Sequence, residues 1–73
     1  MIELLRTNDI ILISRIESLL EERGIEFAVF DAHMSVLEGS IGAIPRRIMV
    51  LNDDLDAARR ALTEVGLGKE LPG

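Results

Sequence analysis

Residues 1–24, MIELLRTNDIILISRIESLLEERG, contain the pattern that decides the fold. The first six residues alternate as a strand does, and Asn8 or Asp9 can then accept the free amide hydrogens of a helix's first turn. The helix predicted over residues 9–23 ends at Gly24, because glycine adopts a left-handed cap conformation at the lowest cost. Strand, cap, helix and glycine therefore form one compact unit.

The predicted helix has one apolar face. Its buried stripe, about 120° wide at 100° per residue, is made of Leu12, Ile13, Ile16, Leu19 and Leu20. Ile11 falls outside this stripe, and we expect it to be exposed. A single exposed isoleucine usually has no function, and a contact surface is the alternative reading of Ile11.

A second unit of the same kind ends the folded region. Strands are predicted at residues 25–30 and 47–51, and the Asn-Asp-Asp run at residues 52–54 repeats the helix-start chemistry. The second helix, over residues 54–65, is expected to end at Gly66 and to bury Leu55, Ala58, Leu62 and Val65.

The order strand, helix, strand, strand, helix predicts an α+β fold. We expect a split βαβ unit in which strands 1 and 3 are parallel neighbours and both helices cover one face. This is a ferredoxin-like β-α-β-β-α sandwich, with a fourth strand that is missing or contributed by the tail. Residues 1–66 would form a single domain, and residues 67–73 a loose tail or short edge segment.

The other face of this sheet is expected to be open and apolar. It would carry Leu5, Ala28, Phe30, Met49 and Leu51. Such a patch usually marks a partner surface, but the connection at residues 31–45, DAHMSVLEGSIGAIP, could instead fold back over it. The interface candidates are Leu5, Phe30, Met49 and Leu51, together with Met34, Val36 and Leu37 from the connection.

Composition excludes several functional classes. The chain has 73 residues, no cysteine, one histidine and a net charge of −5, so disulfides and a thiolate metal site are ruled out. General nucleic-acid binding is disfavoured, since it needs clustered cations and stacking aromatics, and only two phenylalanines are present. No apolar run is long enough for a membrane span, and no signal peptide is evident. A cytoplasmic protein without cofactors is expected, and a small scaffold of this kind often gains support by oligomerisation.

An anion site is one candidate function for the glycine-rich segment. Glycine backbone amides can converge on an anion, and a hydroxyl and two guanidiniums could complete a phosphate or carboxylate pocket. The residues are Gly39, Ser40, Gly42, Arg46 and Arg47. The alternative is a flexible turn in which the arginines are solvated or paired to acidic neighbours, because no Walker sequence is present and a strand follows the loop.

Catalysis has weak support in the sequence. His33 lies between Asp31 and Glu38, which could form an acid–base or metal site, but one histidine with irregularly spaced carboxylates is poor support for either. Capping a turn or packing on the open face of the sheet is the better explanation of His33. We therefore expect a protein that is not an enzyme and has no catalytic or metal-ligating residue.

Several segments together resemble a known family. They are LLRTND, the RGI that ends the first helix, HMSVLEGSIGAIPRRIMV and the DLDAARRAL helix. Over residues 1–66 the chain is similar to the putative prokaryotic signal-transducing proteins, a family of small bacterial domains of unknown function. The resemblance implies a ferredoxin-like fold, broadly like that of the PII nitrogen regulators, and a role in signal transduction. The chain has no counterpart of the long nucleotide-binding loop of PII proteins, which argues against ATP sensing.

Two functional hypotheses follow from the sequence. The first is a regulatory or protein-interaction module that binds a protein or a second copy of itself through the open face and the 31–47 loop. The second is a sensor that binds an anionic metabolite or phosphate at residues 39–47. The sequence names neither the ligand nor the partner.

Overall fold

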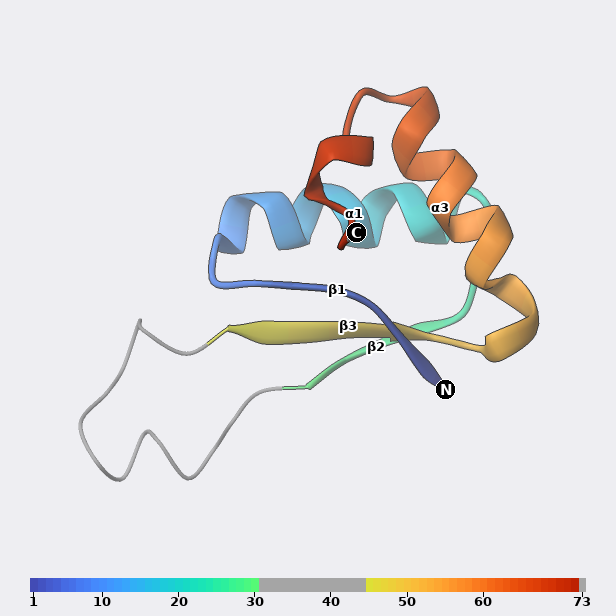
Figure 1. Ribbon diagram of the computed structural model, residues 1–73, viewed down its shortest axis with the longest axis horizontal. Helices are drawn as coiled ribbons and strands as arrows, with labels where there is room; N and C mark the ends of the chain where they lie inside the picture. Colours follow the sequence, from blue (N-terminus) through green and yellow to red (C-terminus); the bar gives the residue numbers. More distant parts are fainter. Residues whose placement is uncertain (31–44, 73) are drawn as a thin grey trace.

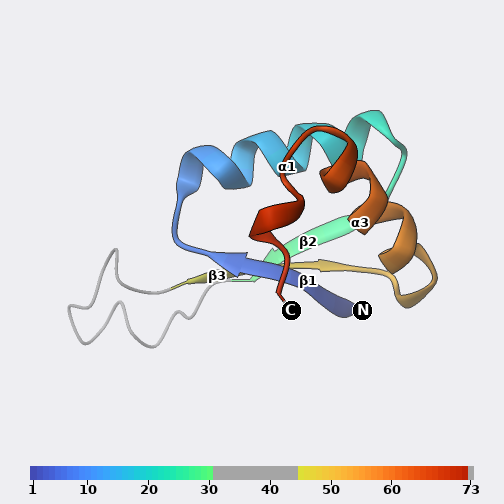
Figure 2. The same ribbon diagram turned by 45° about the horizontal axis from the view of Figure 1, so that its top comes forward.

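The computed structural model describes residues 1–30 and 45–72. In these ranges the elements are β1 (Ile2–Thr7), α1 (Ile10–Glu22), β2 (Phe27–Phe30), β3 (Arg46–Val50), the 3-10 helix η1 (Asn52–Asp54), α3 (Leu55–Glu64) and the 3-10 helix η2 (Gly68–Glu70). Both α-helices lie over the same face of the sheet (Figures 1 and 2). No helix in the described ranges is long and apolar enough to cross a membrane.

The sheet confirms the predicted neighbours but not their direction. The strand order is β1-β3-β2, and β3 is antiparallel to both of its neighbours. The prediction that strands 1 and 3 are parallel was therefore wrong. The α1 crossover makes β1 and β2 parallel, and β3 runs back between them, so the split unit is β1-α1-β2. The result is a ferredoxin-like α+β sandwich with three strands in the described residues.

The start and end of α1 follow from local chemistry. Asp9 is the N-cap, and its Oδ1 accepts hydrogen bonds from the backbone amides of Ile11 and Leu12 at 3.0 and 3.1 Å. At the other end Gly24 has φ +70°, and the Ile25 amide donates to the Leu20 carbonyl at 2.9 Å. This six-to-one bond is the signature of a Schellman C-cap, in which the left-handed residue is usually glycine.

Gly24→Ala should therefore destabilise the protein by about 1 kcal/mol. An added Cβ would meet nothing within 4 Å, so the cost comes from the left-handed backbone and not from a clash. Urea unfolding followed by circular dichroism measures the change. Gly24→Asn is the matched control and should lose less, because asparagine tolerates this conformation better. Equal losses in the two variants would contradict the backbone explanation.

The second helix begins differently from the prediction. The Asn-Asp-Asp run forms η1, and no side chain of this run caps α3. The 3-10 turn satisfies backbone amides itself, since the Asp54 amide donates to the Leu51 carbonyl at 2.9 Å. Ala58, Ala61 and Leu62 are buried.

The chain after α3 also differs from the prediction. The helix ends at Glu64, Gly66 has φ +81°, and the Leu67 amide donates to the Leu62 carbonyl at 2.8 Å. This second Schellman turn brings Leu67 onto the core, so Val65, which was expected to be buried, is exposed. The tail is not loose over residues 67–72, because η2 follows directly and Leu71 packs against the core.

The core lies between the helices and the sheet. It contains Leu4 and Leu5 of β1, the five predicted residues of α1, Ile25, Ile48 and Val50, the three buried residues of α3, and Leu67. Leu4 and Leu5 are consecutive, yet both are buried, because the register with β3 shifts between Glu3 and Leu5. A β-bulge of this kind inserts one extra residue and changes which face the following side chains occupy.

Candidate functional site

The face of the sheet away from the helices is set by two cross-strand rows. Glu3 and Ala28 flank Met49 in one row, and Arg6 and Phe30 flank Arg47 in the other. Residues paired across antiparallel strands point to the same side, and Ile48 and Val50 of β3 point into the core. These six residues, with Leu51 added by alternation along the chain, form what we call the open face. No described helix covers it (Figure 1).

The bulge in β1 builds an ion pair on the open face. In a regular strand, Glu3 and Arg6 would point to opposite sides, because their separation is odd. The extra residue at Leu4 brings them to the same side. The contact is bidentate: Arg6 Nη2 donates to Glu3 Oε1 at 2.9 Å and Arg6 Nε donates to Oε2 at 3.2 Å.

The charges of the open face act on each other. The hydrogen bonds from Arg6 have the largest effect and hold the pKa of Glu3 below its ordinary value. Desolvation comes next and opposes them, and the positive charges of Arg6 and then Arg47 lower the pKa further. The same contact raises the pKa of Arg6. Arg6 and Arg47 are direct cross-strand neighbours, a like-charge arrangement that is unfavourable on its own, and Glu3 offsets it.

A titration of Glu3 tests this arrangement. Because its folded-state pKa is lowered, any stability that Glu3 contributes is present above the unfolded-state pKa and is lost as pH falls through the folded-state value. Following the Glu3 carboxyl by NMR, we expect Arg6→Gln to raise its pKa clearly and Arg47→Gln to raise it less. Arg46→Gln is the matched control and should leave it unchanged. A shift with Arg46→Gln as large as that with Arg47→Gln would contradict the assignment of faces.

The two arginines of the predicted anion site do not share a face. Arg46 and Arg47 are consecutive residues of β3, so their side chains leave the strand on opposite sides. Arg46 is half-buried on the side of Ile48, whereas Arg47 is exposed on the open face beside Arg6. The arginine paired with Arg47 across the strands is therefore Arg6, which the sequence did not single out.

The apolar part of the open face is smaller than predicted. Phe30 is 45% exposed and Leu51 is 41% exposed, while Met49 is half-buried between its strand neighbours. Leu5, which was predicted to lie here, is only 1% exposed and belongs to the core. The bulge moves Leu5 to the helix side and leaves Glu3 and Arg6 on the open face.

The other predicted residues lie outside the described ranges. They are His33, Met34, Val36, Leu37, Gly39, Ser40 and Gly42. The structure brings together Phe30, Arg47 and Met49 of the predicted set, with Leu51 next to them in sequence. It adds Glu3, Arg6 and Ala28 to these. The amino-acid sequence does not distinguish a bulged β1 from a regular one, although the consecutive leucines at positions 4 and 5 are compatible with a bulge.

Comparison with known proteins identifies one family. A family model described as "Putative prokaryotic signal transducing protein" matches residues 1–66. No curated protein matches the chain. The match spans the strands and α-helices of the described residues, and it stops before η2.

Proposed function

This chain belongs to the family of putative prokaryotic signal transducing proteins, and we propose that it is a non-enzymatic regulatory module that binds protein through its open face. The observation that best supports this proposal is the mixed apolar and charged surface formed by Phe30, Arg47, Met49 and Leu51. Aromatic residues, methionine and arginine are the types enriched at protein–protein interfaces. The partner that we propose for this surface is a second copy of the chain, in the bacterial cytoplasm.

The ionisable groups support a binding role over a catalytic one. The open face carries Glu3, Arg6 and Arg47 as its described ionisable residues. The pKa of Glu3 is lowered, so its carboxyl stays ionised near neutral pH. A general acid or base needs a pKa close to the operating pH, which for a carboxyl means a raised value. These groups are suited to orient a partner by charge.

Self-association tests the proposal directly. Light scattering coupled to size exclusion, run from low to high micromolar protein, should show a mass that rises with concentration. Amide NMR signals of β2 and β3 should shift over the same range. Met49→Asp should abolish both effects, because it places a carboxylate at the centre of the open face. Ile10→Asp is the control on an exposed residue of α1. A monomeric mass throughout, with unchanged β2 and β3 signals, would count against the proposal.

An anion sensor is the second candidate, and one observation favours it. Arg6 and Arg47 are cross-strand neighbours, and the single carboxylate beside them neutralises only one positive charge. An anionic metabolite or phosphate could neutralise the other. A thermal-shift series with inorganic phosphate, nucleotides and carboxylate metabolites tests this idea. Saturable stabilisation that is lost in Arg47→Ala and kept in Arg60→Ala would favour the sensor, and no stabilisation by any of them would exclude it.

A further inference from the structure

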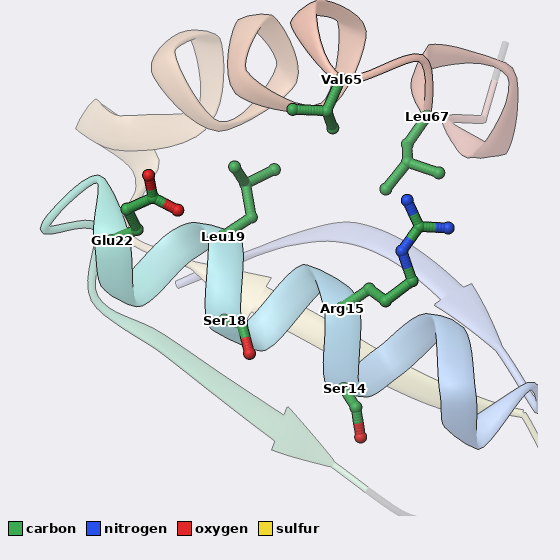
Figure 3. Close-up of a pocket in the computed structure, with 7 residues that line it drawn as sticks. All are labelled: Ser14, Arg15, Ser18, Leu19, Glu22, Val65 and Leu67. Atoms are coloured by element: carbon green, nitrogen blue, oxygen red, sulfur yellow. The ribbon is translucent and has the colours of Figure 1, made fainter.

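A groove runs along α1 on the helical side of the molecule, away from the open face. It consists of two cavities of about 380 and 260 Å³ that share Arg15 and Leu67. The larger is lined by Ser14, Arg15, Ser18, Leu19, Glu22, Val65 and Leu67. The smaller is lined by Thr7, Asp9, Ile11, Leu12, Arg15, Leu67, Lys69 and Glu70. One wall is therefore α1, and the other is the segment that follows α3 (Figure 3).

The groove has an apolar surface in each half. Leu19 points toward Val65 in the larger cavity, and Leu67 points toward α1 (Figure 3). Val65 is 44% exposed there, and Ile11 is 72% exposed at the smaller cavity. The structure thus places the exposed Ile11 at the edge of a cavity, which the sequence did not predict. Two exposed branched side chains, one in each cavity, offer two apolar contact points along one line.

One cation, Arg15, is shared by the two cavities, and a second, Lys69, lines the smaller one alone. Arg15 belongs to both, and its guanidinium extends across the groove toward Leu67 (Figure 3). Among the described residues it forms no ion pair, whereas Arg23 on the same helix is paired to Glu64 at 2.8 Å. The carboxylates of Asp9 and Glu22 lie toward the two ends of the groove, and the smaller cavity is also lined by Lys69 and Glu70, whose opposite charges offset each other. The centre is therefore the place for a negative group, and the ends disfavour one.

We propose that this groove binds an extended peptide segment. The segment has an acidic residue at its centre and an apolar residue two positions before it and two positions after it. On α1 the stripe Ile11, Arg15, Leu19 advances four residues per step, or about 6 Å. In an extended chain every second side chain faces the same way, at intervals of about 6.7 Å. An apolar residue, an acidic residue and a second apolar residue at alternate positions thus match Ile11, Arg15 and, at the level of Leu19, the exposed side chain of Val65.

The proposal does not depend on the role of the open face. The groove lies on the other layer of the sandwich and shares no residue with the open face. A small amphipathic carboxylate would use Arg15 and one cavity only. A peptide uses both, and this difference separates the two ligands in an experiment.

The test uses the full chain and three synthetic peptides. The probe is acetyl-Leu-Ser-Glu-Ser-Leu-amide, and its centre is replaced by Gln or Lys in the other two. Amide shifts of the labelled protein should move at Ile11, Arg15, Val65 and Leu67, and the Glu probe should bind roughly tenfold more tightly than the Gln probe. In Arg15→Glu the order should reverse, with the Lys probe binding best. Arg60→Glu makes the same charge change on α3 outside the groove and should keep the original order.

Two further arms decide between occupants. Val65→Asp alters an exposed residue, so the fold should persist. The affinity of this variant for the Glu probe should fall by at least the difference in affinity between the Glu and Gln probes. Octanoate is the small-molecule competitor. Peptide shifts confined to the open face, no shift at saturating peptide, or octanoate binding as tightly as the Glu probe would each overturn the proposal.

Discussion

Leu5→Ala is expected to destabilise the protein by about 2–5 kcal/mol, the range for truncating a buried leucine. Leu5 is 1% exposed and lies with Leu4 in the core beneath the helices. Truncation removes buried contacts and leaves a cavity that a small core cannot easily fill. The free energy of unfolding, measured by urea titration, should fall by this amount. A domain of this size has little stability in reserve, so the variant can also unfold outright.

The same substitution on the open face provides the control. Leu51→Ala removes the same atoms from a residue that is 41% exposed, and we expect a loss well below that of Leu5→Ala. If Leu5 lay on the open face, as the alternation of the sequence predicts, the two losses would be similar. Similar losses would therefore contradict the β-bulge, while a large difference supports it.

The elements of the fold could be predicted because each is specified locally. The stripe of α1, its Asp9 cap and the glycines at positions 24 and 66 all act within a few residues, and all have the predicted roles. The direction of β3 was not predicted correctly, since it depends on how a whole crossover places β2 beside it. Propensity and periodicity describe segments one at a time, whereas this choice is made between segments.

The composition of the open face was harder to predict for the same reason. A bulge depends on how β1 pairs with β3, and one extra residue exchanges the faces of all that follow. The sequence therefore assigned Leu5 to the open face and overlooked Glu3 and Arg6. Arg46 and Arg47 were grouped because they are adjacent in sequence, although adjacency in a strand means opposite faces.

The two proposed surfaces are arranged so that both can be used at once. The helices and the sheet form separate layers (Figure 2). The open face belongs to the sheet layer, and the groove is lined mostly by α1 and the segment after α3. They differ in charge pattern as well. The open face has an ion pair beside a second arginine, whereas the groove has Arg15 at its centre, Glu22 in the larger cavity, and Asp9, Lys69 and Glu70 in the smaller one. Under the two proposals, the protein would join a second copy through one layer and a peptide through the other.

Ala61→Leu is expected to destabilise the protein by about 1–3 kcal/mol, the usual cost of overpacking a filled core. Ala61 and Ala58 are fully buried, and they allow α3 to lie close to β1 and α1. A leucine at position 61 adds three methylene-sized groups where the packing leaves no room, so α3 must shift or adopt strained side-chain conformations. Because the segment after α3 forms one wall of the groove, a shift of α3 should also move the amide signals of Val65 and Leu67.

Ala57→Leu makes the same change at a half-buried position on the edge of the core and should cost less than Ala61→Leu. An unchanged free energy of unfolding in Ala61→Leu would contradict the close approach of α3 to the sheet.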